Sequence, residues 1–249
     1  MTAFSYQLYS SREFPPLIDT LRMLKRLGYA QVEGYGGVYG DLEALKSALA
    51  EAGLAMTSGH FGLDMLEKEP DRVVEIAKTV GMQAVYCPYL PAEQRPDDAA
   101  GYARFGERLA KAGEPLGKAG ILFGWHNHDF EFRPLPDGSI PLAEILRGGP
   151  ELSWEADIAW IVRGGADPVA WLEKYGDRIS AIHIKDIAPE GEAADEDGWA
   201  DVGTGTVKWK EIMDTVRNRT KARLFIMEHD KPNDHERFAR QSIENARRF

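Results

Sequence analysis

Residues 120–132 read GILFGWHNHDFEF, and this stretch decides how the rest of the chain is interpreted. It begins with the apolar run ILF directly after Gly120, a pattern typical of a buried strand that follows the end of a helix. Its second half is crowded with polar, titratable side chains. In an α/β barrel, residues at the carboxyl ends of the strands carry the chemistry. The stretch therefore predicts a barrel strand that delivers His126 and its neighbours to a functional site.

Short apolar runs alternate with amphipathic helical stretches on both sides of this segment. We expect strands at residues 4–9, 30–33, 54–58, 84–87, 121–123, 152–157, 179–184 and 223–227. Helices are expected at residues 15–27, 41–52, 71–80, 97–119, 141–146, 167–175, 208–216 and 235–248. Eight strand–helix units within 249 residues favour a (β/α)8 TIM barrel that forms one domain, residues 1–249. An open dinucleotide-binding sheet is disfavoured because no GxGxxG motif opens the first helix.

Composition narrows the classes of partner. The chain is 43% hydrophobic and 28% charged, as expected of a soluble globular protein, and its formal net charge is −10. This charge argues against nucleic acid or an anionic membrane as the main partner. One cysteine, Cys87, rules out an internal disulfide. No signal peptide and no apolar run long enough for a membrane span are evident, so we expect a cytoplasmic location.

Polar residues lie at the ends of most of the expected strands. Since all these ends meet at one face of a barrel, the residues there form one candidate site. They are Gln7, Glu33, His60, the cluster from His126 to Glu131, Asp157, His183, Lys185, Asp186, Glu228, His229 and Asp230. Carboxylates and imidazoles in near-buried positions are costly unless they are paired or bind a metal.

The mixed set of nitrogen and oxygen donors suits a divalent cation such as Mn, Mg, Co or Zn, and fits Ca less well. Two glutamates on opposite sides of such a site can also act as a base and an acid. A polar network without metal is the alternative interpretation of the same residues.

Together the motifs resemble a known family. The segment WHNHDFEF at residues 125–132 matches the YHNHDFEF segment of the sugar phosphate isomerase/epimerase group, which belongs to the xylose isomerase-like TIM barrels. Further matches are residues 7–10 (QLYS), 32–35 (VEGY), 58–60 (SGH), 154–157 (WEAD), 183–186 (HIKD), 202–205 (VGTG) and 227–228 (ME). The resemblance covers nearly the whole chain.

This resemblance implies a divalent metal held by Glu, Asp, His and Glu from the fifth to the eighth strand. By position, the ligands would be Glu131, Asp157, His183 and Glu228. Many family members carry the first Glu at the end of the fifth strand itself, where this chain has His126. Either Glu131 or His126 can therefore be the first ligand, and Glu131 is favoured because a second carboxylate keeps a base available.

The implied activity is isomerisation or epimerisation of a sugar or keto-sugar, through α-proton abstraction and a metal-stabilised enediolate. Glu131 and Glu228 would be catalytic. The residues expected to contact the substrate are His60, His126, His128, Lys185, Glu33 and Gln7. Candidate walls for a sugar ring, with core packing as the alternative role, are Trp125, Trp160, Trp199 and Tyr9.

A neutral sugar is favoured over a phosphorylated one. The loop at residues 190–201 is acidic, and we expect it to be a solvated flap over the mouth of the barrel. No cluster of basic residues accompanies it, although the backbone amides of Gly203 and Gly205 are candidates for binding an anion.

Three other functions remain as alternatives. A lyase or hydratase acting on keto-sugars, like an inosose dehydratase or a 3-keto-glycoside eliminase, would share the first proton removal. A sugar-binding barrel without catalysis would show no metal-dependent activity. An endonuclease acting at abasic sites is disfavoured, because six histidines are few for a three-metal cluster and the net charge is negative. A homo-oligomer formed through the outer helices is an expectation by analogy only.

Overall fold

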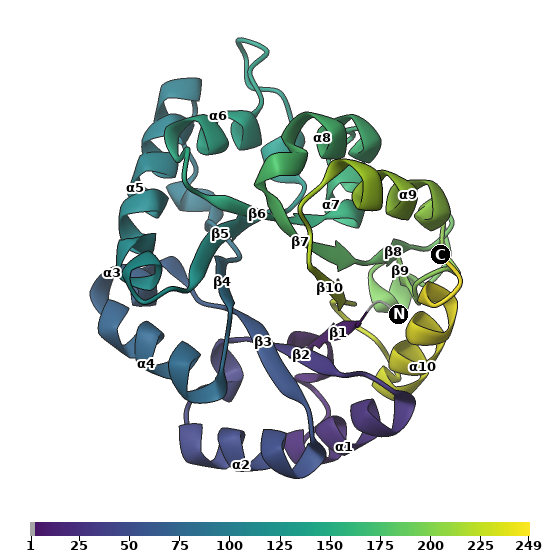
Figure 1. Ribbon diagram of the computed structural model, residues 1–249. Coiled ribbons are helices and arrows are strands. Elements are labelled where there is room, and N and C mark those ends of the chain that lie inside the picture. Colours follow the sequence, from purple (N-terminus) through teal and green to yellow (C-terminus); the bar gives the residue numbers. More distant parts are fainter. Residues whose placement is uncertain (1–2) are drawn as a thin grey trace.

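The computed structural model describes residues 3–249, which form a closed parallel barrel surrounded by helices (Figure 1). Around the barrel the strands follow the order β1-β10-β7-β6-β5-β4-β3-β2. Their bounds are β1 Ser5–Gln7, β2 Gln31–Gly34, β3 Ala55–His60, β4 Ala84–Cys87, β5 Leu122–His126, β6 Ser153–Asp157, β7 Ile179–Ile184 and β10 Leu224–Met227. This confirms the (β/α)8 TIM-barrel fold expected from the alternation of strands and helices.

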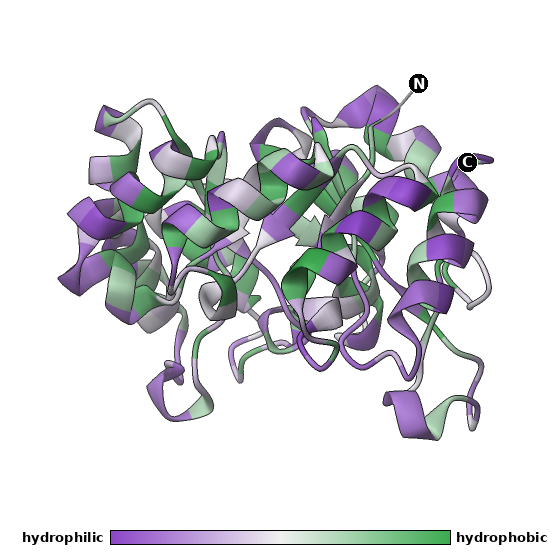
Figure 2. Ribbon diagram, turned by 90° about the horizontal axis from the view of Figure 1, so that it is seen from below, coloured by the Kyte–Doolittle hydropathy of each residue, from purple (hydrophilic) through white to green (hydrophobic). Residues whose placement is uncertain are grey.

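Helices form the outer layer of the molecule. The α-helices are α1 Leu17–Leu27, α2 Leu42–Ala52, α3 Leu63–Lys68, α4 Pro70–Val80, α5 Ala99–Lys118, α6 Pro141–Gly148, α7 Ile158–Arg163, α8 Pro168–Tyr175, α9 Trp209–Arg219 and α10 His235–Ala246. Short 3₁₀ turns are η1 Leu8–Ser11, η2 Gly36–Val38, η3 Ala92–Gln94, η4 Phe130–Phe132, η5 Gly176–Arg178 and η6 Ala194–Glu196. The side view in Figure 2 shows hydrophilic residues on the outer surfaces of these helices. None of the helices described over residues 3–249 is long and apolar enough to cross a membrane.

Local sequence signals account for where several helices begin and end. Asp41 caps α2, since its carboxylate accepts a hydrogen bond from the amide of Ala44. Asp167 caps α8 in the same way, one residue before a proline in the first turn. The chain leaves α2 through Gly53, whose φ of 65° lies in the left-handed region that favours glycine.

The structure also contains elements that the periodicity did not predict. The helices α3 and α7 have six residues each, which is too short for a helical repeat to stand out in the sequence. The expected flap at residues 190–201 includes a strand, β9 Trp199–Ala200, which pairs antiparallel with β8 Asp186–Ile187. Most of residues 190–198 are exposed, as expected of a solvated flap, whereas Glu196, Trp199 and Asp201 are buried.

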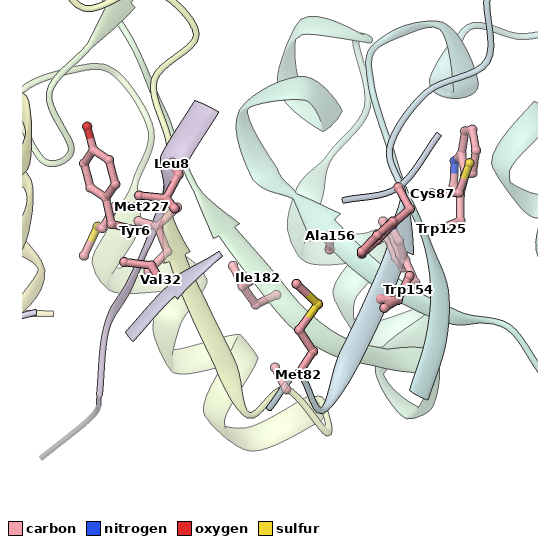
Figure 3. Packing of buried hydrophobic residues seen from close by; sticks show 14 of the residues in the cluster. Tyr6, Leu8, Val32, Met82, Cys87, Trp125, Trp154, Ala156, Ile182 and Met227 are labelled. Carbon is pink, nitrogen blue, oxygen red and sulfur yellow. The ribbon is translucent and has the colours of Figure 1, made fainter. Parts of the chain in front are cut away.

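Strand alternation divides the core into two parts. Outward-facing residues such as Trp125 pack under the helices, and the centroid of the Trp125 ring lies 5.3 Å from that of Phe105 on α5. Figure 3 shows Tyr6, Val32 and Met227 gathered at one side of the barrel and Trp125 and Trp154 at the other. These side chains join strands to helices and leave the alternate positions to fill the barrel interior.

The interior of the barrel is apolar in one layer and polar in the next. Ala84, Tyr86, Ala181, Leu224 and Ile226 form a separate small buried cluster. Two residues further along β7 and β10, the residues are polar, since His183 follows Ala181 and Glu228 follows Ile226. The polar layer consists of buried side chains from six strands, namely Gln7, Glu33, His60, His126, Glu155 and His183.

Candidate functional site

His183 on β7 occupies the centre of the polar layer. Its Nε2 lies 2.7 Å from Glu33 Oε1, and its Nδ1 lies 3.0 Å from Glu228 Oε2. Gln7 donates a further hydrogen bond to Glu33 Oε1, at 2.8 Å. The imidazole thus contacts Glu33 from β2 and Glu228 just after β10, and Glu33 links it to Gln7 from β1, as expected for the carboxyl-terminal face of a barrel.

Glu155 is the functional candidate that the sequence interpretation missed. Its Oε2 lies 2.6 Å from His60 Nε2 and 3.0 Å from His126 Nδ1. A signal for it was present, because Glu155 stands two residues before Asp157 and so faces the same side of β6. The side chain is completely buried, and its second oxygen has no hydrogen-bond partner within residues 3–249.

Two overlapping groups of side chains present ligand atoms that lie within 4.8 Å of one another. One comprises His60, His126, Glu155 and His183, and the other His126, Asp157, His183 and Glu228. Every member of both groups is buried. Three of the four ligands expected by position therefore come together, and His126 accompanies them.

Asp157 has one carboxylate oxygen that is hydrogen-bonded and one that is available to bind a metal. It is level with His183 in the register of β6 against β7. Its Oδ1 accepts a hydrogen bond from the amide of Trp160 at 2.9 Å, while Oδ2 is buried without a hydrogen-bond partner in the described chain and lies 3.9 Å from Lys185 Nζ. A buried carboxylate oxygen that accepts no hydrogen bond costs free energy. Coordination of a divalent cation would remove that cost, so the residues present fit a metal such as Mn, Co or Zn.

Glu131 does not join either group. It lies in η4, beyond the end of β5, where its Oε1 accepts from Trp125 Nε1 and its Oε2 from the amide of His128, each at 2.9 Å. Because Trp125 faces the helices, its hydrogen bond holds the Glu131 carboxyl on the outer side of the strand. Of the two first-ligand candidates, the structure places His126, rather than Glu131, beside Asp157, His183 and Glu228.

Charges are distributed unevenly among the buried histidines. Burial lowers the pKa of His183, but Glu155, Glu228 and Glu33 outweigh it and raise the pKa well above the usual value. His126 behaves in the opposite way, because burial and the charge of His183 lower its pKa to about 4. His126 is thus a neutral imidazole near neutral pH, the form in which histidine binds metals.

Lys185 is fully buried and provides a fixed positive charge. Its Nζ donates to Asp230 Oδ1 at 2.5 Å and to Glu228 Oε2 at 3.3 Å. Burial lowers its pKa, but Asp230, Glu228 and Asp157 together raise it above the usual value. The ammonium group also lies 4.4 Å from the centre of the Trp199 ring. Lys185 therefore stays charged and balances the surrounding carboxylates.

Glu228 is a buried carboxylate whose neighbours favour its ionised form. Burial raises its pKa, but Lys185 and His183 outweigh that effect and hold it well below the usual value. Glu228 lines a cavity of about 580 Å³ at this end of the barrel, together with His60, His126, His128, Tyr9 and Tyr89. An ionised carboxylate at the wall of a ligand-sized cavity can act as a general base.

The predicted contacts to substrate reach this cavity to different extents. His60, His126 and His128 line it, whereas Gln7, Glu33 and Lys185 are fully buried and are not among its lining residues. Of the four aromatic walls considered, Tyr9 lines the cavity. Trp125 and Trp199 are buried within the protein.

The amides of Gly203 and Gly205 are already occupied. Both donate to Asp186 Oδ2, at 2.8 and 3.3 Å, while Ile187 and Val207 donate to Oδ1. A Cβ at Gly205 would lie 2.3 Å from Asp186 Oδ1, which explains the glycine. The expectation that these amides could bind an anion was wrong, because a carboxylate of the chain itself takes that place.

Comparison with known proteins agrees with this architecture. The sequence matches the family model of the xylose isomerase-like TIM barrel over residues 21–249, so the chain belongs to this family. The resemblance inferred from the motifs is thereby confirmed. A search of curated proteins finds no match.

Solved structures show the same fold. A sugar phosphate isomerase/epimerase from Parabacteroides distasonis has a TM-score of 0.82 and 22% identity, covering 98% of this chain and 93% of its own. The IOLI protein with a zinc atom has a TM-score of 0.75 and 15% identity, covering 99% and 96%. The 3-keto-D-glucoside 4-epimerase from E. coli has a TM-score of 0.74 and 16% identity, covering 100% of both chains.

Proposed function

We propose that this protein is a divalent-metal-dependent isomerase or epimerase of a sugar or keto-sugar. The observation that carries the proposal is the buried group of His126, Asp157, His183 and Glu228, of which His126 and Glu228 line the cavity. The zinc atom of the IOLI protein and the sugar substrate named for the E. coli epimerase support it through the shared fold.

In this proposal the metal ligands are His126, Asp157, His183 and Glu228. A divalent ion held there supplies Lewis-acid polarisation of a carbonyl. Glu131 was the favoured first ligand and base on the sequence alone. We now assign it a supporting role, since its carboxyl holds the His128 amide and the Trp125 indole.

Glu228 takes the proton from the carbon next to the carbonyl. Its oxygen Oε2 is held by His183 and Lys185, which keeps the carboxylate ionised and oriented. Lys185 offsets negative charge that develops on the substrate oxygens. Returning the proton from Glu228 to the neighbouring carbon gives an isomer. Epimerisation instead requires a second proton donor on the opposite face of the same carbon, because Glu228 serves one face.

His128 is positioned to bind a sugar hydroxyl. Burial, together with the charges of His126 and Lys185, lowers its pKa well below the usual value, so the ring is neutral. Its Nδ1 is buried without a hydrogen-bond partner within residues 3–249, and the residue lines the cavity. A substrate hydroxyl would satisfy this nitrogen.

The test is exchange of the α-proton in deuterated water. Mn²⁺-loaded protein is incubated with a panel of keto-sugars, and deuterium incorporation is followed by NMR. The proposal expects metal-dependent incorporation and a rearranged sugar. Release of water or of an alcohol from the β-carbon would instead identify a lyase, since that reaction begins with the same proton removal. Absence of exchange across the panel would contradict both.

A further inference from the structure

Two tyrosines at the mouth of the cavity stand out from the apolar residues of the surface. Within residues 3–249 the exposed large apolar side chains are Tyr9 (36%), Tyr89 (44%), Leu122 (42%) and Val162 (39%). Both tyrosines line the same cavity that reaches Glu228. Exposed aromatic rings beside a concave site are typical of ligand recognition rather than core packing.

Each tyrosine ring is held in place by its neighbours. The Tyr9 ring meets the Tyr35 ring edge-on, with centroids 5.4 Å apart and planes 83° apart, and the Arg12 guanidinium carbon lies 3.9 Å from the Tyr9 centroid. On the other side, the Tyr89 hydroxyl accepts a hydrogen bond from Arg95 at 2.9 Å. Fixed rings lose little conformational freedom when a ligand packs against them.

The charged side chains around the cavity disfavour an anionic ligand. Asp197, Glu228 and Asp230 line it, and Arg12 is the cation among its lining residues. Arg12 already donates to the carbonyl oxygen of Tyr9. The amides of Gly203 and Gly205, which would otherwise attract a phosphate, bind Asp186. What the mouth offers is therefore aromatic surface and hydrogen-bonding groups for a neutral, polar ring.

The two tyrosines lie nearer the surface than the proposed base and metal ligands. The proposed base and metal ligands are almost completely buried, whereas Tyr9 and Tyr89 are more than a third exposed. Tyr9 belongs to η1, directly after β1, and Tyr89 lies two residues beyond the end of β4. A volume of about 580 Å³ falls in the range that holds drug-sized ligands, and so leaves space beyond a single sugar ring.

From these observations we infer that the mouth of the cavity is a subsite for a second, neutral ring, so that the substrate is a glycoside or disaccharide rather than a free or phosphorylated monosaccharide. This inference rests on the proposed function for the placement of the reacting ring at Glu228. The second ring packs its apolar C–H face against Tyr89 or Tyr9, and its hydroxyls contact Arg12 and Asp197.

Binding to the Zn²⁺-loaded protein tests the inference without requiring turnover. The probes are glucose with cellobiose and maltose, galactose with lactose, xylose with xylobiose, and glucose 6-phosphate, each measured by calorimetry and by saturation-transfer NMR. We expect at least one disaccharide to bind about 10-fold or more tightly than its monosaccharide, as one or two aromatic contacts provide. Saturation transfer should reach both of its rings.

Two variants and one control locate the effect. Tyr9→Ala and Tyr89→Ala should each lower the affinity for the disaccharide by about 10-fold more than the affinity for the monosaccharide. Leu122→Ala removes an equally exposed apolar side chain outside the cavity and should change neither affinity. Circular dichroism of all three variants establishes that they are folded.

Three results would overturn the inference: no disaccharide binds more tightly than its monosaccharide, both tyrosine variants lower the affinities for disaccharide and monosaccharide equally, or glucose 6-phosphate binds most tightly. The proposed function is judged separately, by metal-dependent α-proton exchange. Metal-dependent α-proton exchange without a preference for disaccharides would contradict the subsite alone. A preference for disaccharides without α-proton exchange would contradict the proposed function alone.

Discussion

The carboxyl group of Glu131 is hydrogen-bonded to the indole nitrogen of Trp125, at 2.9 Å. Trp125 precedes His126 on β5, so the two side chains point to opposite faces of the strand. The tryptophan packs against Phe105 under the helices, and the histidine reaches the polar centre of the barrel. One hydrogen bond to the outward residue thus separates Glu131 from the proposed metal ligands.

This relationship predicts which residue of the WHNHDFEF segment binds the metal. His126→Ala should lower the affinity for Zn²⁺ by about 100-fold or more, above the range typical of residues that only support a ligand. Glu131→Gln should leave the affinity close to that of the wild type. Competition with a chromogenic chelator measures both, and a larger loss in the Glu131 variant would restore Glu131 as the ligand.

Glu228→Gln tests the base. The amide is similar in shape but cannot accept the α-proton, so metal-dependent exchange should fall by about 10²–10⁴-fold. The matched control is Glu236→Gln, a change on the outer surface at α10, which should retain wild-type exchange. Wild-type exchange in the Glu228 variant would show that this carboxylate is not the base.

The pH dependence of stability tests the burial of Glu131. Burial raises its pKa to about 8, despite the hydrogen bonds from its own amide, the His128 amide and Trp125. Because the pKa is raised in the folded state, the contribution to stability is complete below the ordinary value of 4.5 and is lost as pH rises through about 8. Over this window the unfolded chain has released a proton that the folded chain retains.

Chemical denaturation of metal-free protein measures the effect. The free energy of unfolding of the wild type, minus that of Glu131→Gln, should decrease between pH 5 and pH 8. The slope is limited to about 1.4 kcal/mol per pH unit for one proton. A difference that stays constant with pH would mean that Glu131 is ionised in the folded protein throughout.

Asp186→Ala should loosen the segment between β7 and α9. The buried carboxylate accepts hydrogen bonds from the amides of Ile187, Gly203, Gly205 and Val207, and their loss should destabilise the fold by about 1–3 kcal/mol. Limited proteolysis should cut residues 187–207 faster than in the wild type. Glu192→Ala, an exposed change in the same loop, is the control, and equal cleavage in both variants would contradict this account.

Much of the architecture could be predicted because strand and helix periods are local properties of the sequence. The bounds of β4 and β7 agree with the predicted ones at both ends. The first predicted strand was too long, since its last two residues, Leu8 and Tyr9, belong to the turn η1. Its ending there matters for function, because the turn brings Tyr9 to the mouth of the cavity.

The site was less accessible to sequence reasoning, for two physical reasons. Glu155 lies within a strand rather than at its end, and only the closed barrel shows that its carboxylate meets His60 and His126. Glu131 matches the WHNHDFEF segment, but the direction of its side chain is set by the turn η4. A turn of three residues leaves no periodic pattern in the sequence. The sequence positions were enough to identify most residues of the candidate site. Which of them meet at its centre depends on the side of the strand to which each side chain points.

Metal content is the most direct test of the central claim. Untagged wild-type protein, Asp157→Ala and the exposed control Asp137→Ala are incubated with Mn²⁺, Co²⁺ or Zn²⁺, desalted and analysed by mass spectrometry. The account predicts close to one equivalent of metal in the wild type and in the Asp137 variant, and loss of that metal in Asp157→Ala. Metal-free wild-type protein after all three incubations, or full retention in Asp157→Ala, would contradict it.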